Sequence, residues 1–245
     1  MTLIGFDTSM AVTVACVIPP SGEPVCTPRP DPKRLLGPPA HSAELLPALA
    51  ELLEQGGTGW DEVTAIAVGV GPGTFTGLRI GLATARGLGQ GLGVPLHPVS
   101  SLEALAAGIA AGAEAPSGTP ILPLIDAKRG QVFASLHLAG EPLRREWGPV
   151  ALSPEDLDAR IARAAQPPLA AGDWALESIR RLKRAGAVVP APESGLHAID
   201  PTQVCRLARE ADPCSPERVH PVYVRQPDAE IARSARHEAP GDGPA

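Results

Sequence analysis

The hydrophobic pattern in the first half of the chain alternates between strand-like and helix-like segments. Apolar runs at residues 2–9, 11–18 and 66–70 predict buried strands, because turn-forming residues bound each of them. Apolar residues spaced three and four apart over 41–55 predict an amphipathic helix that ends at two glycines. A further helix is predicted over 77–93, after a glycine-rich loop. This alternation is typical of an α/β layer.

The second half resumes after a hinge-like stretch at residues 113–120. Apolar runs at 121–125 and 132–136 predict a hairpin, in which Asp126 and Arg129 are expected to shape the turn rather than perform chemistry. The other predicted elements are helices beginning near 153, 173 and 202 and a short strand at 168–171. Residues 228–245 lack periodicity, and we expect a mobile tail there.

The loop between the strand at 66–70 and the helix at 77–93 has the layout of an anion-binding turn. Gly71 and Gly73 permit positive φ and close backbone approach, and N–H groups at the following helix start favour a phosphate or carboxylate. The spacing matches neither the P-loop nor the dinucleotide-binding fingerprint. A tight strand-to-helix turn with no ligand explains the same residues equally well.

Two helices carry stripes that could face a partner protein or the chain's own sheet. The first stripe consists of Leu45, Leu49, Leu52 and Leu53. The second is a row of small residues at every fourth position, including Gly77, Gly81, Ala85 and Gly89. Small residues on one helix face allow another backbone to approach closely. We expect the two stripes to form a partner interface, with close packing on the chain's own sheet as the alternative.

Asp7 lies at the end of the first predicted strand, before Thr8 and Ser9. In the sugar-kinase, Hsp70 and actin superfamily, an aspartate at this turn helps to hold a metal ion near nucleotide phosphates. That superfamily usually has glycine after the aspartate, and the side chains of Thr8 and Ser9 would crowd a phosphate. We therefore interpret Asp7, Thr8, Gly71 and Gly73 as a vestigial nucleotide site, with ordinary turn formation as the alternative.

Three segments together resemble the TsaB (YeaZ) family: the Phe-Asp-Thr-Ser start, the helix His-Ser-Ala-Glu-Leu-Leu-Pro at residue 41, and Gly-Pro-Gly-Thr-Phe-Thr-Gly-Leu-Arg at residue 71. The likeness covers residues 1 to about 107. Residues 125–133 and 221–225 resemble later motifs of the family. The resemblance implies an actin-like (ASKHA) fold of two RNase H-like halves, with residues 1–107 as the first subdomain and a reduced second subdomain at 108–227.

The resemblance also implies a function. It indicates a non-catalytic subunit that pairs with the enzyme TsaD and, with the ATPase TsaE, supports threonylcarbamoylation of the tRNA adenosine beside the anticodon. A homodimer is expected when the chain is alone, with tRNA contacted indirectly and with ATP and metal bound by the partner subunits. The chain is expected to have no cofactor and no catalytic residue of its own.

The catalytic relatives provide a comparison for a metal site. In TsaD a His-x-x-x-His pair follows the glycine-rich helix, whereas this chain has Ser101 and Leu105 at those places, and leucine cannot bind a cation. Ser101 is instead predicted to cap a helix.

Two enzyme alternatives stay open. One is a nucleotide-dependent kinase or ATPase using Asp7, Gly71, Gly73 and Gly172. The other is a metallopeptidase, for which the His-Glu-x-x-His motif and paired histidines are missing, and the Gly-x-Ser-x-Gly motif of serine hydrolases is missing as well.

Composition narrows the class of protein further. The chain has 245 residues, 44% of them hydrophobic, and a net charge of −6, which disfavours a dominant electrostatic grip on nucleic acid. A basic run at 180–184 is most simply a solvated helix face. The four cysteines have no Cys-x-x-Cys spacing, and the sequence has no signal peptide or long apolar span. We therefore expect a cytoplasmic protein with reduced thiols and no membrane contact.

Overall fold

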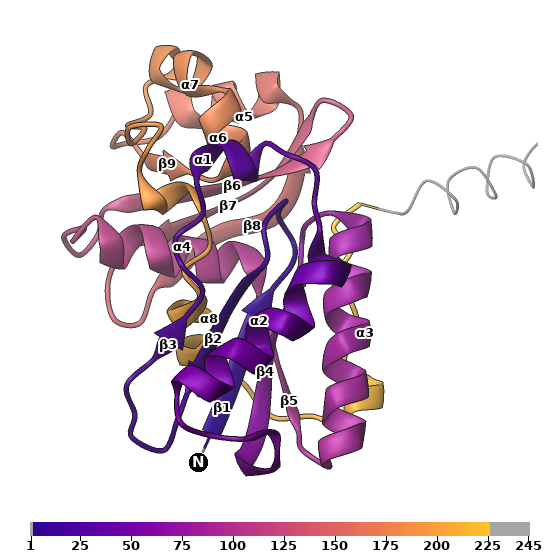
Figure 1. The fold of residues 1–245 in the computed structure, drawn as a ribbon. Helices are drawn as coiled ribbons and strands as arrows, with labels where there is room; N and C mark the ends of the chain where they lie inside the picture. Colours follow the sequence, from indigo (N-terminus) through magenta and orange to yellow (C-terminus); the bar gives the residue numbers. More distant parts are fainter. Residues whose placement is uncertain (1, 226–245) are drawn as a thin grey trace, which may run out of the picture.

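Two β-sheets form the framework of the computed structural model, which describes residues 2–225 (Figure 1). The first sheet has the strand order β3-β2-β1-β4-β5. Its strands are β1 (Thr2–Asp7), β2 (Val14–Ile18), β3 (Val25–Cys26), β4 (Val63–Gly71) and β5 (Leu96–Ser100). β1 and β2 form an antiparallel hairpin, whereas β4 is parallel to both β1 and β5. Parallel neighbours need long crossover connections, and the predicted helices supply them.

Helices cover both faces of the first sheet. The crossover helices α2 (His41–Gln55) and α3 (Phe75–Leu92) lie on one face, where they pack on Ile4 and Phe6. The helix α8 (Pro201–Ala208) lies on the other face, where it packs against β1 and β2. Leu3 of β1 belongs to the buried cluster on this other face, because successive side chains along a strand point to opposite faces of the sheet. A short helix α1 (Pro32–Leu35) precedes α2.

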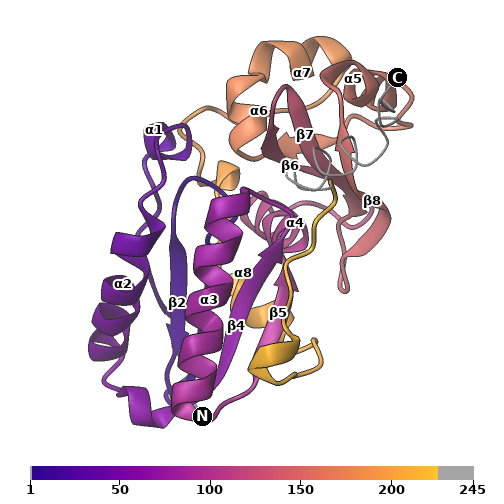
Figure 2. The same ribbon diagram turned by 90° about the vertical axis from the view of Figure 1, so that its right-hand side faces the viewer.

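The second sheet is smaller, with the strand order β8-β7-β6-β9. Its strands are β6 (Pro120–Lys128), β7 (Gln131–Leu138), β8 (Arg144–Leu152) and β9 (Leu169–Ala171). The helices α5 (Pro154–Ala162), α6 (Asp173–Glu177) and α7 (Ile179–Ala185) pack with it around a separate apolar cluster. Figure 2 shows these three helices at the top of the molecule, above α4.

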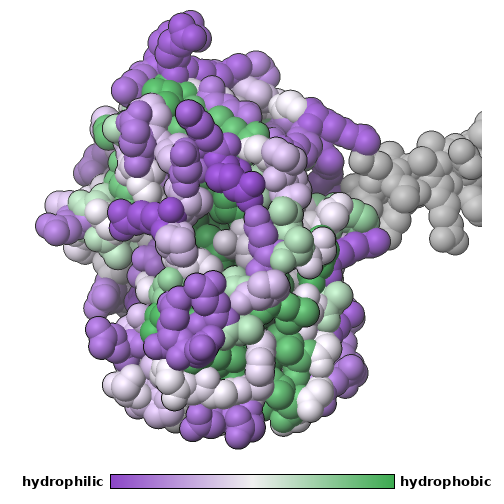
Figure 3. All heavy atoms as spheres, viewed as in Figure 1, coloured by the Kyte–Doolittle hydropathy of each residue, from purple (hydrophilic) through white to green (hydrophobic). Residues whose placement is uncertain are grey.

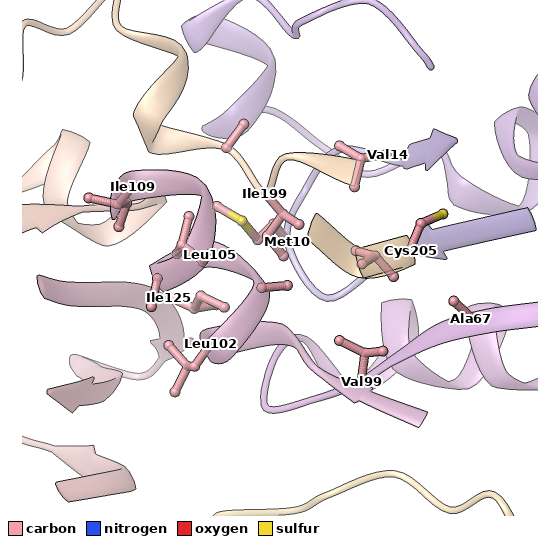
Figure 4. Packing of buried hydrophobic residues seen from close by; sticks show 14 of the residues in the cluster. Met10, Val14, Ala67, Val99, Leu102, Leu105, Ile109, Ile125, Ile199 and Cys205 are labelled. Atoms are coloured by element: carbon pink, nitrogen blue, oxygen red, sulfur yellow. The ribbon is translucent and has the colours of Figure 1, made fainter. Parts of the chain in front are cut away.

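The helix α4 (Ser101–Gly112) joins the two sheets into one core. Leu102 and Leu105 on this helix belong to the same buried cluster as Ile125 from β6 and Met10 from the β1–β2 turn (Figure 4). The predicted subdomain boundary between residues 107 and 108 therefore falls inside a helix. The reason is that α4 is both the end of the first α/β unit and a cover for the second sheet.

The end of the described chain returns to the first sheet. Cys214 pairs with Leu96, and the 3-10 turn η3 (Pro216–Arg218) packs against α3. The segment then runs past β5 towards the second sheet, and the Val222 N–H donates to the Val70 carbonyl at 2.8 Å (Figure 2). The second subdomain predicted at 108–227 is therefore not continuous in the packing. The tail predicted at 228–245 lies outside the described residues.

Candidate functional site: the loop and cleft between the sheets

The β1–β2 turn and the glycine-rich loop pack directly on each other. Thr8 donates its hydroxyl hydrogen to the Gly77 carbonyl at 2.8 Å, and the Thr74 N–H donates to the Ser9 carbonyl at 2.8 Å. A Cβ atom at Gly77 would overlap the Thr8 carbonyl oxygen, and one at Gly73 would overlap Ser9. The missing side chains therefore make room for the chain's own turn.

Asp7 is fixed by hydrogen bonds from its own chain. Its carboxylate accepts the Ser9 N–H at 2.7 Å and the Ser101 hydroxyl at 2.6 Å. The Ser101 oxygen in turn accepts the Gly71 N–H at 3.1 Å. A Cβ at Gly69 would overlap the Asp7 carboxylate, so that glycine is needed for the carboxylate to lie across β4.

The role predicted for Ser101 is wrong. The cap of α4 is Ser100, whose hydroxyl accepts the Glu103 N–H at 3.4 Å. Ser101 is fully buried and links Asp7 to the glycine-rich loop instead. Two adjacent serines have equal capping ability in the sequence, and only the register of the helix distinguishes them. No local pattern in the sequence indicates the contact between Ser101 and Asp7.

The four residues of the predicted nucleotide site therefore lie together, but in contacts that the chain itself makes. The Gly71 N–H is bonded to Ser101, and the Thr8 hydroxyl is bonded to Gly77. Gly71 has φ +100°, which explains the glycine independently of any ligand. These contacts support the tight-turn alternative to a nucleotide site.

A cleft of 490 Å³ lies beside this loop, between the two sheets. Its lining comes from the start of α3, from the β6–β7 turn with Asp173, and from the segment at 222–225, with Ala11, Gly37 and Pro39 completing it. The polar and aromatic side chains of the lining include Thr74, Phe75, Asp126, Lys128, Asp173, Tyr223 and Arg225. The rings of Phe75 and Tyr223 stack with centroids 5.9 Å apart, and the Arg79 guanidinium lies 3.8 Å from the Phe75 centroid.

The β6–β7 turn at the cleft is shaped by Asp126, as predicted. The Asp126 carboxylate accepts the Lys128 N–H at 2.7 Å and pairs with the Lys128 ammonium at 2.6 Å. Arg129 and Gly130 connect the two strands and have φ values of 53° and 72°, the left-handed conformation of a tight two-residue hairpin turn, and the preceding Lys128 has φ 60°. The prediction that Asp126 forms the turn is confirmed.

Asp173 is the buried acid of the cleft, with 6% of its surface exposed. Its carboxyl oxygen Oδ1 accepts the Asp126 N–H at 2.9 Å and the Trp174 N–H at 2.7 Å. Burial is the main reason why the pKa of Asp173 is raised to about 7, and the nearby Asp126 charge adds to the increase. The sequence marked Asp173 only as part of a helix start.

Replacing Asp173 with asparagine is expected to alter how stability depends on pH. The folded protein keeps this proton up to about pH 7, whereas the unfolded chain releases it near 3.8. The proton's contribution to stability is therefore complete below pH 3.8 and is lost as the pH rises to about 7.

The free energy of unfolding of Asp173→Asn, minus that of the wild type, should accordingly increase across this window, by at most ~1.4 kcal/mol per pH unit. Denaturant titrations of both proteins at several pH values measure it. Subtracting the wild-type value cancels the contribution of His137, because both proteins contain it. Burial lowers the pKa of His137 to about 4, so this residue makes stability rise with pH, opposite to Asp173. A difference that does not change with pH would show that Asp173 is ionised in the folded protein.

The residues predicted to form the partner interface face inward. Leu45, Leu49, Leu52 and Leu53 are at most 4% exposed and pack on the first sheet. Gly77 and Gly81 approach Thr8, and Gly89 approaches Leu96 and Pro216. Both stripes therefore serve the chain's own core, because the apolar face of a sheet must be covered and these helices cover it.

The opposite faces of α2 and α3 form an exposed apolar surface, which we call the outer helix face. It consists of the exposed residues Leu46 and Ala50 on α2 and Ala83, Gly87 and Gly91 on α3, and the half-buried Ile80 and Leu88 flank it. Leu46 is 48% exposed, and a Cβ at Gly87 or Gly91 would meet nothing within 4 Å. Figure 3 shows hydrophobic residues gathered over this part of the molecule.

Ser101 and Leu105, at the places of the metal-binding histidines in TsaD, are both buried in the core. Within residues 2–225, no three His, Cys, Asp or Glu side chains are grouped so that they could hold a metal ion. The cleft residues present the two carboxyl groups of Asp126 and Asp173 beside the cationic side chains of Lys128 and Arg225.

Comparisons with known proteins agree with this architecture. A family model described as "TsaD: tRNA N6-adenosine threonylcarbamoyltransferase" matches residues 38–177. The chain is 30% identical to the Escherichia coli protein "tRNA threonylcarbamoyladenosine biosynthesis protein TsaB" over 200 residues, which cover 78% of this chain and 83% of that protein. It is 39% identical to the protein of the same name from Bacillus subtilis over 97 residues, 40% of each chain.

A solved structure titled "YeaZ from Pseudomonas aeruginosa" is also similar. It superposes with a TM-score of 0.72 at 26% identity and covers 91% of this chain and 99% of its own. The predicted α/β fold of the actin-like (ASKHA) type is thereby confirmed. The likeness extends across both sheets, well beyond the first 107 residues that carried most of the sequence resemblance. The chain therefore belongs to the TsaB (YeaZ) family of tRNA threonylcarbamoyladenosine biosynthesis proteins.

Proposed function

We propose that this chain is a non-catalytic subunit in the biosynthesis of tRNA threonylcarbamoyladenosine, and that it pairs with a TsaD-like enzyme. The observation that carries the proposal is the packing of the β1–β2 turn into the glycine-rich loop, where Asp7 and Thr8 are bonded to the chain itself. A superfamily aspartate held by Ser9 and Ser101 is poorly placed to hold a metal and phosphates. The reaction in which the chain takes part is inferred from relatives whose names assign them to this biosynthesis.

The outer helix face is the surface that we assign to the partner. It is apolar and exposed, and its glycines leave open space above the α3 backbone, which permits close helix packing. The proposed interface is therefore formed by the two helices that the sequence predicts, α2 and α3, but by their outer face and not by the two stripes. We propose that the isolated chain forms a homodimer through the same face, which the TsaD-like partner displaces.

The remaining components are assigned to the partners. A TsaE-like ATPase and the TsaD-like enzyme bind ATP and metal, and the tRNA reaches this chain only through the complex. Arg181, the second residue of the basic run, pairs with Glu155 at 2.9 Å and Asp158 at 2.8 Å, which supports a structural role for it. In the described part of the chain, no helix has the length and apolarity to cross a membrane. We propose the cytoplasm, where tRNA is modified, as the location.

The second candidate function is a nucleotide-dependent kinase or ATPase. The 490 Å³ cleft between the sheets favours it, because nucleotides bind between the halves in the ASKHA superfamily. The two functions differ in what the isolated chain does with ATP.

Reconstitution of the modification from purified proteins tests the proposal. The chain, a TsaD-like protein and a TsaE-like protein from the same organism are combined with tRNA and the threonylcarbamoyl donor, and modified adenosine is measured by mass spectrometry of nucleosides. We expect modification with all three proteins, background levels when this chain is omitted, and neither modification nor ATP turnover by this chain alone. ATP hydrolysis by the isolated chain at enzymatic rates would favour the second candidate.

A further inference from the structure

Two cysteines face each other across neighbouring strands of the first sheet. Cys16 in β2 and Cys26 in β3 are register partners, and their sulfur atoms lie 2.7 Å apart as free thiols. A third thiol, Cys205 in α8, lies below the sheet, with its sulfur 3.9 Å from the Cys16 carbonyl oxygen. The function proposed above uses none of these groups.

The backbone pairing suits a bond between the first two thiols. The Thr27 N–H donates to the Ala15 carbonyl at 2.9 Å, which makes Ala15 and Thr27 a hydrogen-bonded pair. Because the two pair types alternate along an antiparallel ladder, Cys16 and Cys26 form a non-hydrogen-bonded pair. The Cα atoms of such pairs are about 4.5 Å apart, within the range of about 4.4–6.8 Å that a disulfide spans.

The two thiols differ in accessibility. Cys16 is fully buried, whereas Cys26 is partly exposed on β3, the edge strand of the sheet. Cys26 also lines a cavity of 210 Å³ together with Arg29 and Asp200. A small reagent therefore reaches Cys26 first, with Cys16 directly behind it.

We propose that Cys16 and Cys26 form an oxidation site in which hydrogen peroxide converts the two thiols reversibly into a disulfide across β2 and β3. This inference is independent of the proposed function. The bond would tie the edge strand to the centre of the sheet.

The reaction balances with peroxide as the two-electron oxidant. The Cys26 sulfur, as thiolate, attacks one peroxide oxygen, the O–O bond breaks, and the other oxygen leaves as hydroxide and takes up the proton of Cys26 to form water. The product is a sulfenic acid on Cys26. The Cys16 sulfur then attacks the Cys26 sulfur, the S–O bond breaks, and the departing oxygen leaves as a second water with the Cys16 proton. Two thiols are oxidised and one peroxide is reduced.

The surroundings slow the first step. The neighbouring Cys16 thiol, burial and the charge of Asp200 raise the pKa of Cys26 above its usual value, and the Cys205 thiol and burial raise that of Cys16. Arg29 is the cationic group that lines the same cavity. Since the thiolate is the nucleophile, the disulfide should form slowly at neutral pH and faster at higher pH.

Counting thiols in the full-length chain tests the proposal. The protein is treated with hydrogen peroxide, denatured, and titrated for free thiols, and linked peptides are identified by mass spectrometry. We expect the four thiols to fall to two, with Cys16 linked to Cys26, and a reducing agent to restore four. The variant Cys26→Ser should keep its three thiols, whereas Cys214→Ser, which leaves the pair intact, should fall from three to one.

Other outcomes overturn the proposal. A link between Cys16 and Cys205, a link between two molecules through Cys26, or conversion of Cys26 to a sulfinic acid without loss of Cys16 would each contradict it. Four thiols after treatment that fully oxidises a model dithiol would contradict it as well. Because none of these readouts involves a partner protein, failure here leaves the proposed function standing, and failure of the reconstitution leaves the thiol site standing.

Discussion

Replacing Gly77 with alanine is expected to destabilise the fold more than any other single methyl addition in α3. The new Cβ would overlap the Thr8 carbonyl oxygen, a backbone atom held in place by the bond between the Thr8 hydroxyl and the Gly77 carbonyl. Relief requires either the turn or the helix to move, and overpacking of this kind typically costs 1–3 kcal/mol and occasionally more. With backbone as the obstacle, we expect a loss of about 3 kcal/mol or more in denaturant unfolding.

The same substitution at Gly87 is the matched control. A Cβ there meets nothing within 4 Å, and alanine favours a helix over glycine by ~1 kcal/mol. Gly87→Ala should therefore unfold at a higher denaturant concentration than the wild type. Equal losses at both positions would show that α3 tolerates no side chains for a reason other than contact with Thr8.

The helix α2 shows how much local pattern can predict. The sequence placed a helix at 41–55, and the structure has α2 at His41–Gln55. Regularly spaced leucines define the helical face, and the paired glycines at 56 and 57 end it, so both signals lie within one segment. The hairpin of β6 and β7 was equally readable, because apolar runs flank its turn residues.

Whether a helix face points to the protein core or to solvent could not be predicted in the same way. Spacing shows that Gly77, Gly81 and Ala85 share a face, but it does not show what packs on that face. The answer depends on the β1–β2 turn, far away in the sequence, whose Thr8 occupies the space above Gly77 and Gly81. The general need to cover a sheet was the signal that favoured the inward direction.

Contacts across long sequence separations explain the other differences. The strand β3 was not predicted, because it has only two residues and lies within a proline-rich stretch. Two residues are too few to show the alternation of apolar and polar positions that is typical of a strand. The return of the chain to the first sheet rests on pairs such as Leu96 with Cys214 and the bond from Val222 to Val70. No local pattern encodes such pairing. The pocket around Asp173 likewise forms only when both sheets are in place.

The second large effect is expected at the outer helix face. Gly87→Leu adds a side chain into open space on α3, so the fold should keep its stability or gain slightly. If the TsaD-like partner packs closely there, the leucine overlaps the partner's backbone. Bulk inserted into a close contact costs ~1–3 kcal/mol, which corresponds to about a 10- to 100-fold weaker complex.

Ala162→Leu is the matched control for bulk. Ala162 is an exposed residue at the end of α5, on the second sheet and outside the outer helix face. This variant should bind the partner as the wild type does. Loss of binding by both variants would trace the effect to added apolar surface in general rather than to the position of Gly87.

The most direct test is the dissociation constant of the complex with the TsaD-like protein of the same organism, measured for the wild type, Gly87→Leu and Ala162→Leu alongside their thermal melts. We expect a complex for the wild type and Ala162→Leu, and about 10- to 100-fold weaker binding for a normally melting Gly87→Leu. Unchanged affinity for Gly87→Leu would contradict the assignment of the outer helix face to the partner, and no complex with the wild-type chain would contradict the role of a partner subunit altogether.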